Sequence, residues 1–182
     1  MKKAIIFLTD GFEEMEALVP ADILHRAGVD ISLLSITGNL EVTGSHGFKV
    51  IASALFDSNT DVSCVDMLIL PGGPGVSNYG QCKDLANALL AHNEKNQHIA
   101  AICAAPLFLG ELGLLNDKTA TCFPALADKL IAHKTVSDAV VTDGNITTGK
   151  AAGASAEFGL ELARVLVGSE EANRVKAAMY IE

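Results

Sequence analysis

The stretch IAAICAAPLFLGELGLL, residues 99 to 115, decides the fold class of this chain. Residues 99–102 form a short apolar run that suits a buried β-strand, and the residues after Cys103 repeat apolar side chains at helical spacing. The segment around Cys103, AAICAAP, is built of small residues, which a tight turn between a strand and a helix requires. This stretch therefore predicts a strand that runs directly into a helix, with Cys103 at the corner.

The same alternation of strand and helix recurs along the chain. Apolar runs end at turns rich in glycine or proline, and helical patterns follow them. The predicted strands are 3–9, 31–36, 67–70, 99–102 and 120–122. Two hairpins are also expected, one that pairs 40–43 with 48–52 and one around Val140 and Ile146. The predicted helices are 15–27, 85–90, 104–115, one that begins at Leu126, and 155–167. No repeat or linker divides the chain. We therefore expect a single α/β domain over residues 1–182, with a mostly parallel sheet and helices on both faces.

Composition and charge exclude several classes of function. The 182 residues carry a net charge of -9, which repels nucleic acid and anionic membrane surfaces. The apolar run after Lys3 is too short for a secretory signal, and no stretch approaches the ~20 apolar residues that span a bilayer. The four cysteines form no CxxC pattern, so we expect free thiols, no metal and a cytoplasmic protein.

Three unusual turns follow predicted strands, namely residues 10–16, the glycine loop 72–75 and Cys103. Parallel strands point the same way, so these turns gather along the rim of the sheet where ligands bind in such folds. Glycines in the loop 72–75 would let backbone N–H groups approach an oxyanion, although ordinary turn building explains them equally well. The loop matches neither the Walker A motif nor GxGxxG, so neither ATP nor a dinucleotide cofactor is expected.

Cys103 is the candidate nucleophile of this rim. A thiol at a helix N-terminus lies close to unpaired N–H groups and to the positive end of the helix dipole, and both favour the thiolate. We therefore expect a lowered pKa for Cys103. The alternative interpretation is a small residue of the core, and this segment alone supports it equally well.

An acidic cluster of Glu13, Glu14 and Glu16 follows the first predicted strand. Carboxylates in the first turn of a helix ordinarily complement its dipole and remain solvated. If one of them is carried inward beside a thiolate, burial and the negative sulfur raise its pKa and leave a protonated acid that donates a hydrogen bond to sulfur. The pattern alone does not select one of the three.

Five segments together resemble the DJ-1/ThiJ/PfpI superfamily over nearly the whole chain: DGFEEMEALVPADILHRAG, LILPGGPG, AAICAAPLFLGELGLL, FPALADKL and GASAEFGLELARVLVG. The segment AICAAP with a following FP is most similar to the bacterial ThiJ/YajL-like branch. The resemblance implies a flavodoxin-like three-layer sandwich with Cys103 at a nucleophile elbow. It also implies that Glu16 is the buried, protonated acid that holds this cysteine.

The resemblance assigns further features to the same site. The backbone N–H groups of Gly73 and Ala104 correspond to the oxyanion donors of the superfamily, whereas Glu13 and Glu14 would face outward. Members of the superfamily are usually homodimers, and we expect the same here. The resemblance therefore gives a catalytic pair, two backbone donors and a second copy of the chain as partner.

Three positions differ from patterns found in some relatives. Protease-like members carry His directly after the cysteine, where this chain has Ala104, so peptidase activity is not expected. Phe123 stands where some relatives have a His before Pro, and Lys150 lies near where some have Arg, so anion binding of their kind is not implied. Glutamine amidotransferases share the elbow but need a late His and Glu, and no His follows His133.

The function implied by the resemblance is a stress-linked activity on small reactive aldehydes, of the glyoxalase III or deglycase type. In this hypothesis Cys103 adds to an aldehyde such as methylglyoxal, and Glu16 relays protons. The alternative is a redox sensor or chaperone that acts through oxidation of Cys103 by a small oxidant. An older family label, thiamine biosynthesis, finds no phosphate-binding motif here. Cys122 is either a resolving thiol or an inert core residue, and His46 lies in a turn without an assigned role.

Overall fold

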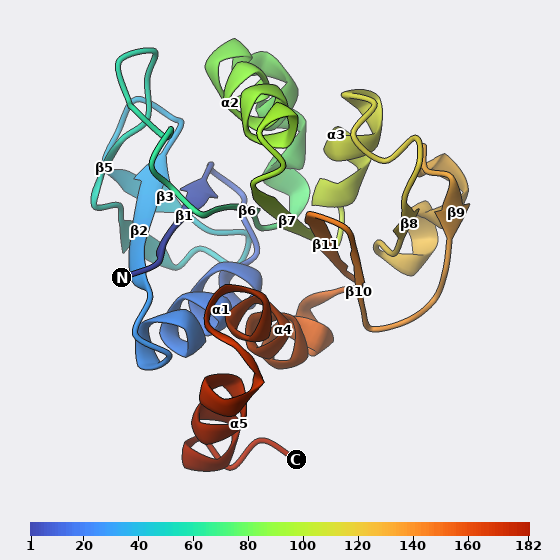
Figure 1. Ribbon diagram of the computed structural model, residues 1–182. Helices are drawn as coiled ribbons and strands as arrows, with labels where there is room; N and C mark the ends of the chain where they lie inside the picture. Colours follow the sequence, from blue (N-terminus) through green and yellow to red (C-terminus); the bar gives the residue numbers. More distant parts are fainter.

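A seven-stranded sheet forms the centre of the protein (Figure 1). The structure is a computed structural model that describes residues 1–182. The strands lie in the order β10–β11–β7–β6–β1–β2–β5, and every neighbouring pair is parallel except β10 with β11. Their bounds are β1 Lys3–Leu8, β2 Asp30–Ser35, β5 Ala54–Leu55, β6 Met67–Leu70, β7 His98–Ile102, β10 Val140–Asp143 and β11 Ile146–Gly149.

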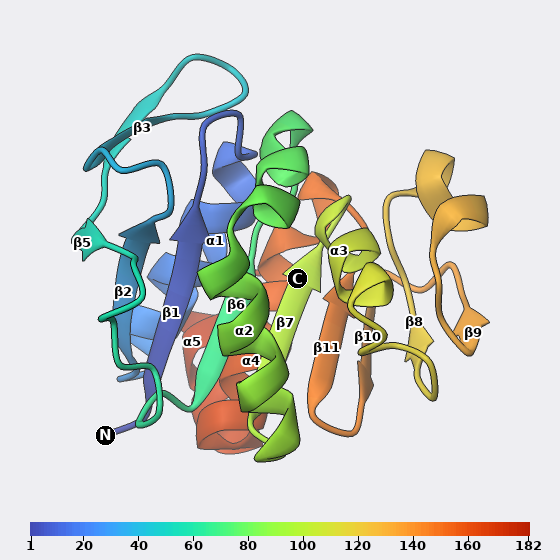
Figure 2. The same cartoon turned by 90° about the horizontal axis from the view of Figure 1, so that it is seen from above.

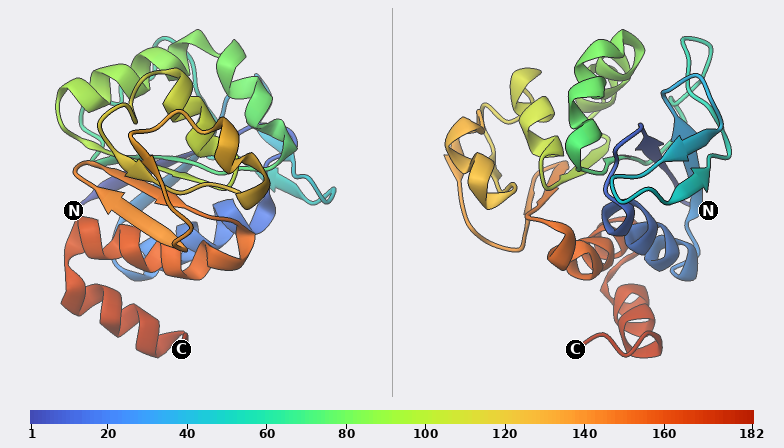
Figure 3. Two further views of the ribbon diagram at one scale, coloured as in Figure 1. Left: turned by 90° about the vertical axis from the view of Figure 1, so that its right-hand side faces the viewer. Right: turned by 180° about the vertical axis from the view of Figure 1, so that it is seen from behind.

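Helices cover both faces of this sheet, which confirms the predicted flavodoxin-like three-layer fold (Figures 1 and 3). One face carries α1 (Glu14–Arg26) and α4 (Ser155–Val167), and α5 (Ser169–Ala178) packs against α4 outside this layer. The other face carries α2 (Lys83–Glu94), α3 (Ala105–Glu111) and the 3-10 segment η1 (Pro74–Gln81). None of these helices combines the length and the apolar character that crossing a membrane requires.

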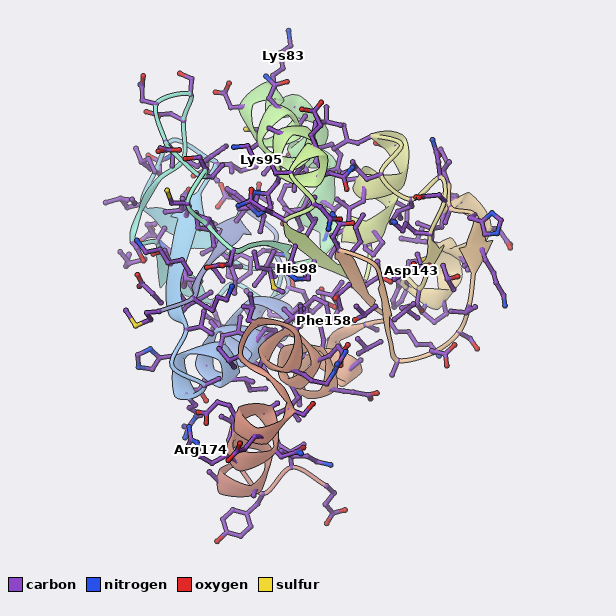
Figure 4. The ribbon with its side chains drawn as sticks, in the orientation of Figure 1. Lys83, Lys95, His98, Asp143, Phe158 and Arg174 are labelled. Atoms are coloured by element: carbon purple, nitrogen blue, oxygen red, sulfur yellow. The ribbon has the colours of Figure 1, made fainter.

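Two apolar cores hold the layers together, one on each face of the sheet. All four residues of β6 are buried, because Leu68 and Leu70 face one core and Met67 and Ile69 face the other. Such a continuous apolar run is typical of a parallel strand covered on both sides. Phe158 of α4 is fully buried in the second core and points toward the sheet (Figure 4).

The region after residue 118 differs most from the prediction. The expected strand 120–122 is only β8 (Thr119–Ala120), and it pairs with β9 (Lys134–Thr135) rather than with the main sheet. The expected helix from Leu126 is only the short 3-10 segment η2 (Pro124–Lys129). No residue of η2 is fully buried, and only Leu126 and Ala127 pack partly against the core, so too little apolar surface is buried to stabilise a longer helix there.

The hairpin predicted for residues 40–52 is present as β3 (Glu41–Thr43) and β4 (Lys49–Ile51). Its Val42 is fully buried in the core on the α1 side, where Val50 packs against it. The hairpin turn lies at the carboxyl edge of the sheet, above β1 and β2 (Figure 2). It therefore stands next to the loop that leads into α1.

The loops after β1 and β6 meet at the same edge of the sheet (Figure 2). The Glu13 N–H donates to the Gly72 carbonyl at 3.0 Å, and the Gly75 N–H donates to the Gly11 carbonyl at 3.0 Å. From β1 the chain continues to β2 on one side and returns to β6 on the other, so this edge is the topological switch point of the sheet. Ligands bind at this position in open α/β folds.

The close contact between these two loops leads to a prediction on stability. A Cβ at Gly75 would overlap the backbone of Asp10 and Gly11, so Gly75→Ala is expected to lower the free energy of unfolding by about 1–3 kcal/mol. Gly80 lies in the same 3-10 segment with nothing within 4 Å of an added Cβ, so Gly80→Ala is expected to change it by less than about 1 kcal/mol. Urea unfolding measures both, and equal losses would contradict the contact.

Candidate active site

Cys103 stands at a sharp corner between β7, which ends at Ile102, and α3, which begins at Ala105. Its φ of 66° lies in the left-handed region, which costs a non-glycine residue about 1–3 kcal/mol. Two backbone hydrogen bonds hold the corner: its N–H donates to the Gly149 carbonyl at 2.9 Å, and its carbonyl accepts from the Phe123 N–H at 2.8 Å. The half-buried side chain therefore projects from a turn with the geometry of a nucleophile elbow.

Glu16 reaches the same point from the first turn of α1. Its side chain has no solvent exposure, and its Oε2 accepts a hydrogen bond from the Gly72 N–H at 2.9 Å. The carboxyl group lies close enough to the sulfur of Cys103 for each group to shift the pKa of the other. The Glu16 N–H donates to Oε2 of Glu13, the N-cap residue of α1, at 2.9 Å. This cap fixes the start of the helix and so the direction of Glu16.

Backbone groups of the glycine loop complete the surroundings of the sulfur. The N–H groups of Gly73 and Ala104 lie near the sulfur and act to lower the pKa of Cys103. Gly72 has no room for a side chain, because a Cβ there would lie 2.7 Å from Cys103 Cβ and 2.7 Å from Glu16 Oε2. The structure thus brings together all four residues that the sequence singled out, Cys103, Glu16, Gly73 and Ala104.

The pKa of Cys103 differs from the lowered value that the sequence predicted. Burial raises the pKa of Glu16 to about 7. Burial and an ionised Glu16 raise the pKa of Cys103 to about 12, and the Gly73 and Ala104 donors only partly oppose this. The expected lowering of the Cys103 pKa is therefore wrong while Glu16 is ionised. The seven-residue helix α3 offers a weak dipole, and the neighbouring carboxylate outweighs it.

The two groups titrate as a coupled pair, so the two pKa values describe the pair rather than either residue alone. The first proton leaves near pH 7 and the second near pH 12, and between them Glu16 and Cys103 hold one proton. The Glu16 Oε1 atom is buried without a hydrogen-bond partner, which disfavours the carboxylate. The half-buried sulfur lies near the N–H groups of Gly73 and Ala104, which favour the thiolate.

Glu14 contradicts the expectation that it faces outward, since it is buried at 8% exposure. Its oxygens accept from the His46 N–H at 2.8 Å and from the Ser45 hydroxyl at 3.0 Å, and Oε2 lies 2.8 Å from His46 Nδ1. Burial opposes ionisation of Glu14, but these hydrogen bonds outweigh it and lower its pKa to about 2. Glu14 therefore fastens the β3–β4 turn to α1, a role that no local sequence pattern indicated.

This contact also predicts a pH-dependent stability. The hydrogen bond and the negative charge of Glu14 raise the pKa of His46. The stabilisation is therefore fully present below the ordinary histidine pKa of about 6.5 and is lost as the pH rises through the raised value. His46→Gln should lower the urea midpoint more at about pH 5 than at about pH 9. His25→Gln, on the exposed face of α1, is the control, and the same loss for His46→Gln at both pH values would contradict the ion pair.

The other candidate residues lie outside this pair. Cys122 is buried at 3% exposure, burial raises its pKa, and all four cysteines are free thiols. Lys150 donates from Nζ to the Ser137 carbonyl at 2.7 Å. Glu13, Glu14 and His46 place ligand atoms within 4.8 Å of one another. A metal there would have to displace the hydrogen bonds that Glu14 and His46 already make.

Fold and site together define a class, the flavodoxin-like α/β proteins with a cysteine at a nucleophile elbow beside a buried carboxyl group. The model of the DJ-1/PfpI family matches residues 2–165, and the chain belongs to this family.

Relatives and solved structures agree with this assignment. Protein DJ-1 homolog B of Arabidopsis thaliana is 38% identical over 98% of this chain, which spans only 41% of that longer protein. The glutathione-independent glyoxalase DJR-1.2 of Caenorhabditis elegans is 31% identical over 94% of this chain and 92% of its own length. The crystal structure of Drosophila melanogaster DJ-1beta has a TM-score of 0.92 at 31% identity, covering 100% of this chain and 98% of that one. The structure of oxidized Toxoplasma gondii DJ-1 has a TM-score of 0.93 at 29% identity, covering 99% of this chain and 98% of that one.

Proposed function

We propose that this protein converts small 2-oxoaldehydes such as methylglyoxal into 2-hydroxy acids, with Cys103 as nucleophile and Glu16 as proton carrier. The observation that supports this most directly is the position of the fully buried Glu16 carboxyl group beside Cys103, with Gly72 packed against both residues. The relative in Caenorhabditis elegans that is named a glutathione-independent glyoxalase supports the same chemistry. Four free cysteines favour a reducing compartment such as the cytoplasm.

The reaction follows from the atoms at the site. The thiolate of Cys103 forms a C–S bond with the aldehyde carbon, and the resulting oxyanion takes the proton of Glu16 while the N–H groups of Gly73 and Ala104 stabilise it. The Glu16 carboxylate then removes the hydrogen of that carbon as a proton, and a proton is returned to the neighbouring carbon. The hydroxyl proton passes to the oxygen of that neighbouring carbon, which gives a thioester of a 2-hydroxy acid. Water cleaves the thioester, so one aldehyde and one water yield one 2-hydroxy acid and the free cysteine. A deglycase would begin with the same addition to a sugar-derived carbonyl.

The direct test uses purified protein, methylglyoxal and no added glutathione. We expect the aldehyde to disappear and lactate to appear in equal amounts. Loss of methylglyoxal without lactate would contradict the proposed route, because it would indicate only trapping of the aldehyde by surface groups.

A second candidate function is redox sensing or a chaperone activity switched by oxidation. The specific observation in its favour is the similarity to the solved structure of an oxidized DJ-1. Peroxide would transfer oxygen to the Cys103 thiolate and leave as water, and a second transfer would give a sulfinate held by Glu16 and the two N–H donors. We expect mild peroxide to add two oxygen atoms to Cys103 first. Earlier oxidation of the exposed Cys64 would contradict this function.

We further propose that the chain forms a homodimer through the β3–β4 hairpin. Two large apolar side chains of this hairpin face solvent, with Phe48 69% and Ile51 66% exposed. Burying such side chains against a second copy is favourable. The double variant Phe48→Asp, Ile51→Asp should elute at the 19.0 kDa of one chain, whereas the unchanged protein and the control Leu90→Asp should elute at twice that mass. A monomeric unchanged protein would contradict the proposal.

A further inference from the structure

A hollow of ≈ 430 Å³ reaches the two residues whose N–H groups face the sulfur, Gly73 and Ala104. Half of its ten lining residues are hydrophobic, among them Leu107 and Phe108 from α3 and Leu126 from η2. The hollow therefore extends from the backbone donors along the side of α3. A molecule bound in it would have its reacting end near Cys103.

Glu111 is the one charged residue that lines this hollow. It is exposed and ends α3, about 10 Å along the helix axis from Ala104 at the 1.5 Å rise per residue. No Lys, Arg or His lines the hollow, and the pair of Cys103 and Glu16 carries one negative charge above about pH 7. The electrostatic potential along the hollow is therefore negative at both ends.

We propose that this hollow makes Cys103 react preferentially with neutral and cationic carbonyl compounds over anionic ones, and that Glu111 is the residue that sets the preference. The substrates are then aldehydes with a short apolar part and, at the far end, either no charge or an ammonium or guanidinium group. Aldehydes that carry a phosphate or carboxylate are disfavoured. The inference rests on the proposed function only in taking Cys103 as the reacting nucleophile.

The expected size of the effect follows from Coulomb's law. One unit charge about 10 Å away in water changes the local concentration of a monovalent reagent about twofold, so removing it changes the ratio of cation to anion rates about fourfold. Salt at about 0.1 M screens most of this, because the Debye length is then about 10 Å. The ratio should therefore change two- to fourfold at low salt and much less at high salt.

Three methanethiosulfonates of similar size test the proposal without any enzyme assay. Each transfers a thioethyl group, which carries trimethylammonium, hydroxyl or sulfonate at its end, to a thiolate; a disulfide bond forms, the S–SO2 bond breaks and methanesulfinate leaves. Site-resolved mass spectrometry follows the modification of Cys103 at low salt, and each rate is divided by the rate of the same reagent with a free cysteine derivative. We expect the corrected order to be cationic, then neutral, then anionic.

The variant Glu111→Gln should lower the corrected ratio of cation to anion rates two- to fourfold, and Glu111→Lys should lower it further. Glu170→Gln, exposed on α5, changes the net charge by the same amount and should leave the ratio unchanged. An unchanged ratio in both Glu111 variants would overturn the inference while leaving the proposed function intact. Absence of Cys103 modification by all three reagents would overturn the proposed function, and this inference with it.

Discussion

Replacing Cys103 with alanine is expected to lower kcat/KM for methylglyoxal by about 10³-fold or more, down to the background of the solution reaction. The reason is that no other group can form the C–S bond at this corner. Of the remaining thiols, Cys122 is buried among apolar residues, and neither Cys64 nor Cys82 lines the hollow beside Gly73 and Ala104. The measurement is lactate formation under steady-state conditions.

The matched control is Cys64→Ala, which removes an exposed thiol outside the site. It should retain full activity. Cys103→Ala should also fold at least as stably as the unchanged protein, since it keeps the small side chain that the corner requires and removes a half-buried polar atom. A Cys103→Ala variant that still forms lactate at more than about a tenth of the original rate would contradict the proposed nucleophile.

The variant Glu16→Gln is expected to have the second large effect on activity, a loss of about 10²–10⁴-fold in kcat. The amide keeps the shape of the side chain, and its oxygen can still accept from the Gly72 N–H. It cannot give a proton to the oxyanion or take one from carbon, so both proton transfers fail. Binding of substrate should change little, because Glu16 does not line the hollow along α3 and the amide has nearly the same volume.

Glu94→Gln, exposed at the end of α2, is the matched control and should keep its activity. Comparing the change in kcat with the change in KM distinguishes a proton carrier from a residue that acts only in binding or structure. A fall in kcat with nearly constant KM supports proton transfer by Glu16. A rise in KM at constant kcat would contradict it, because the residue would then act only in binding.

The sequence alone predicted a mostly parallel sheet with helices on both faces, because the signals for these elements are local. The apolar runs of β1, β6 and β7 mark strands buried on both faces, glycines follow the first two and small residues follow the third, and parallel strands bring their ends to the same rim. The choice of Glu16 among three neighbouring acids came from the resemblance to the superfamily, and α1 does carry it into the core.

The features that the sequence did not predict depend on contacts between segments that are distant along the chain. The pKa of Cys103 is set by burial and by Glu16, 87 positions earlier in the chain, rather than by its own helix. Glu14 is buried because the β3–β4 turn, 31 and 32 positions later, supplies its hydrogen-bond donors. The short strand β5 and the mostly exposed helix α5 carry too few buried apolar residues to give a periodic pattern.

The account depends on where the single shared proton of the pair resides. The most direct measurement is the ultraviolet absorbance of the Cys103 thiolate as a function of pH, with Cys103→Ala as the blank. We predict that thiolate absorbance begins to rise as the pair loses its first proton, near pH 7, because Glu16 and Cys103 then share the proton that remains. A thiolate that appears only near pH 12 would place the charge on Glu16 and contradict the proposed nucleophile.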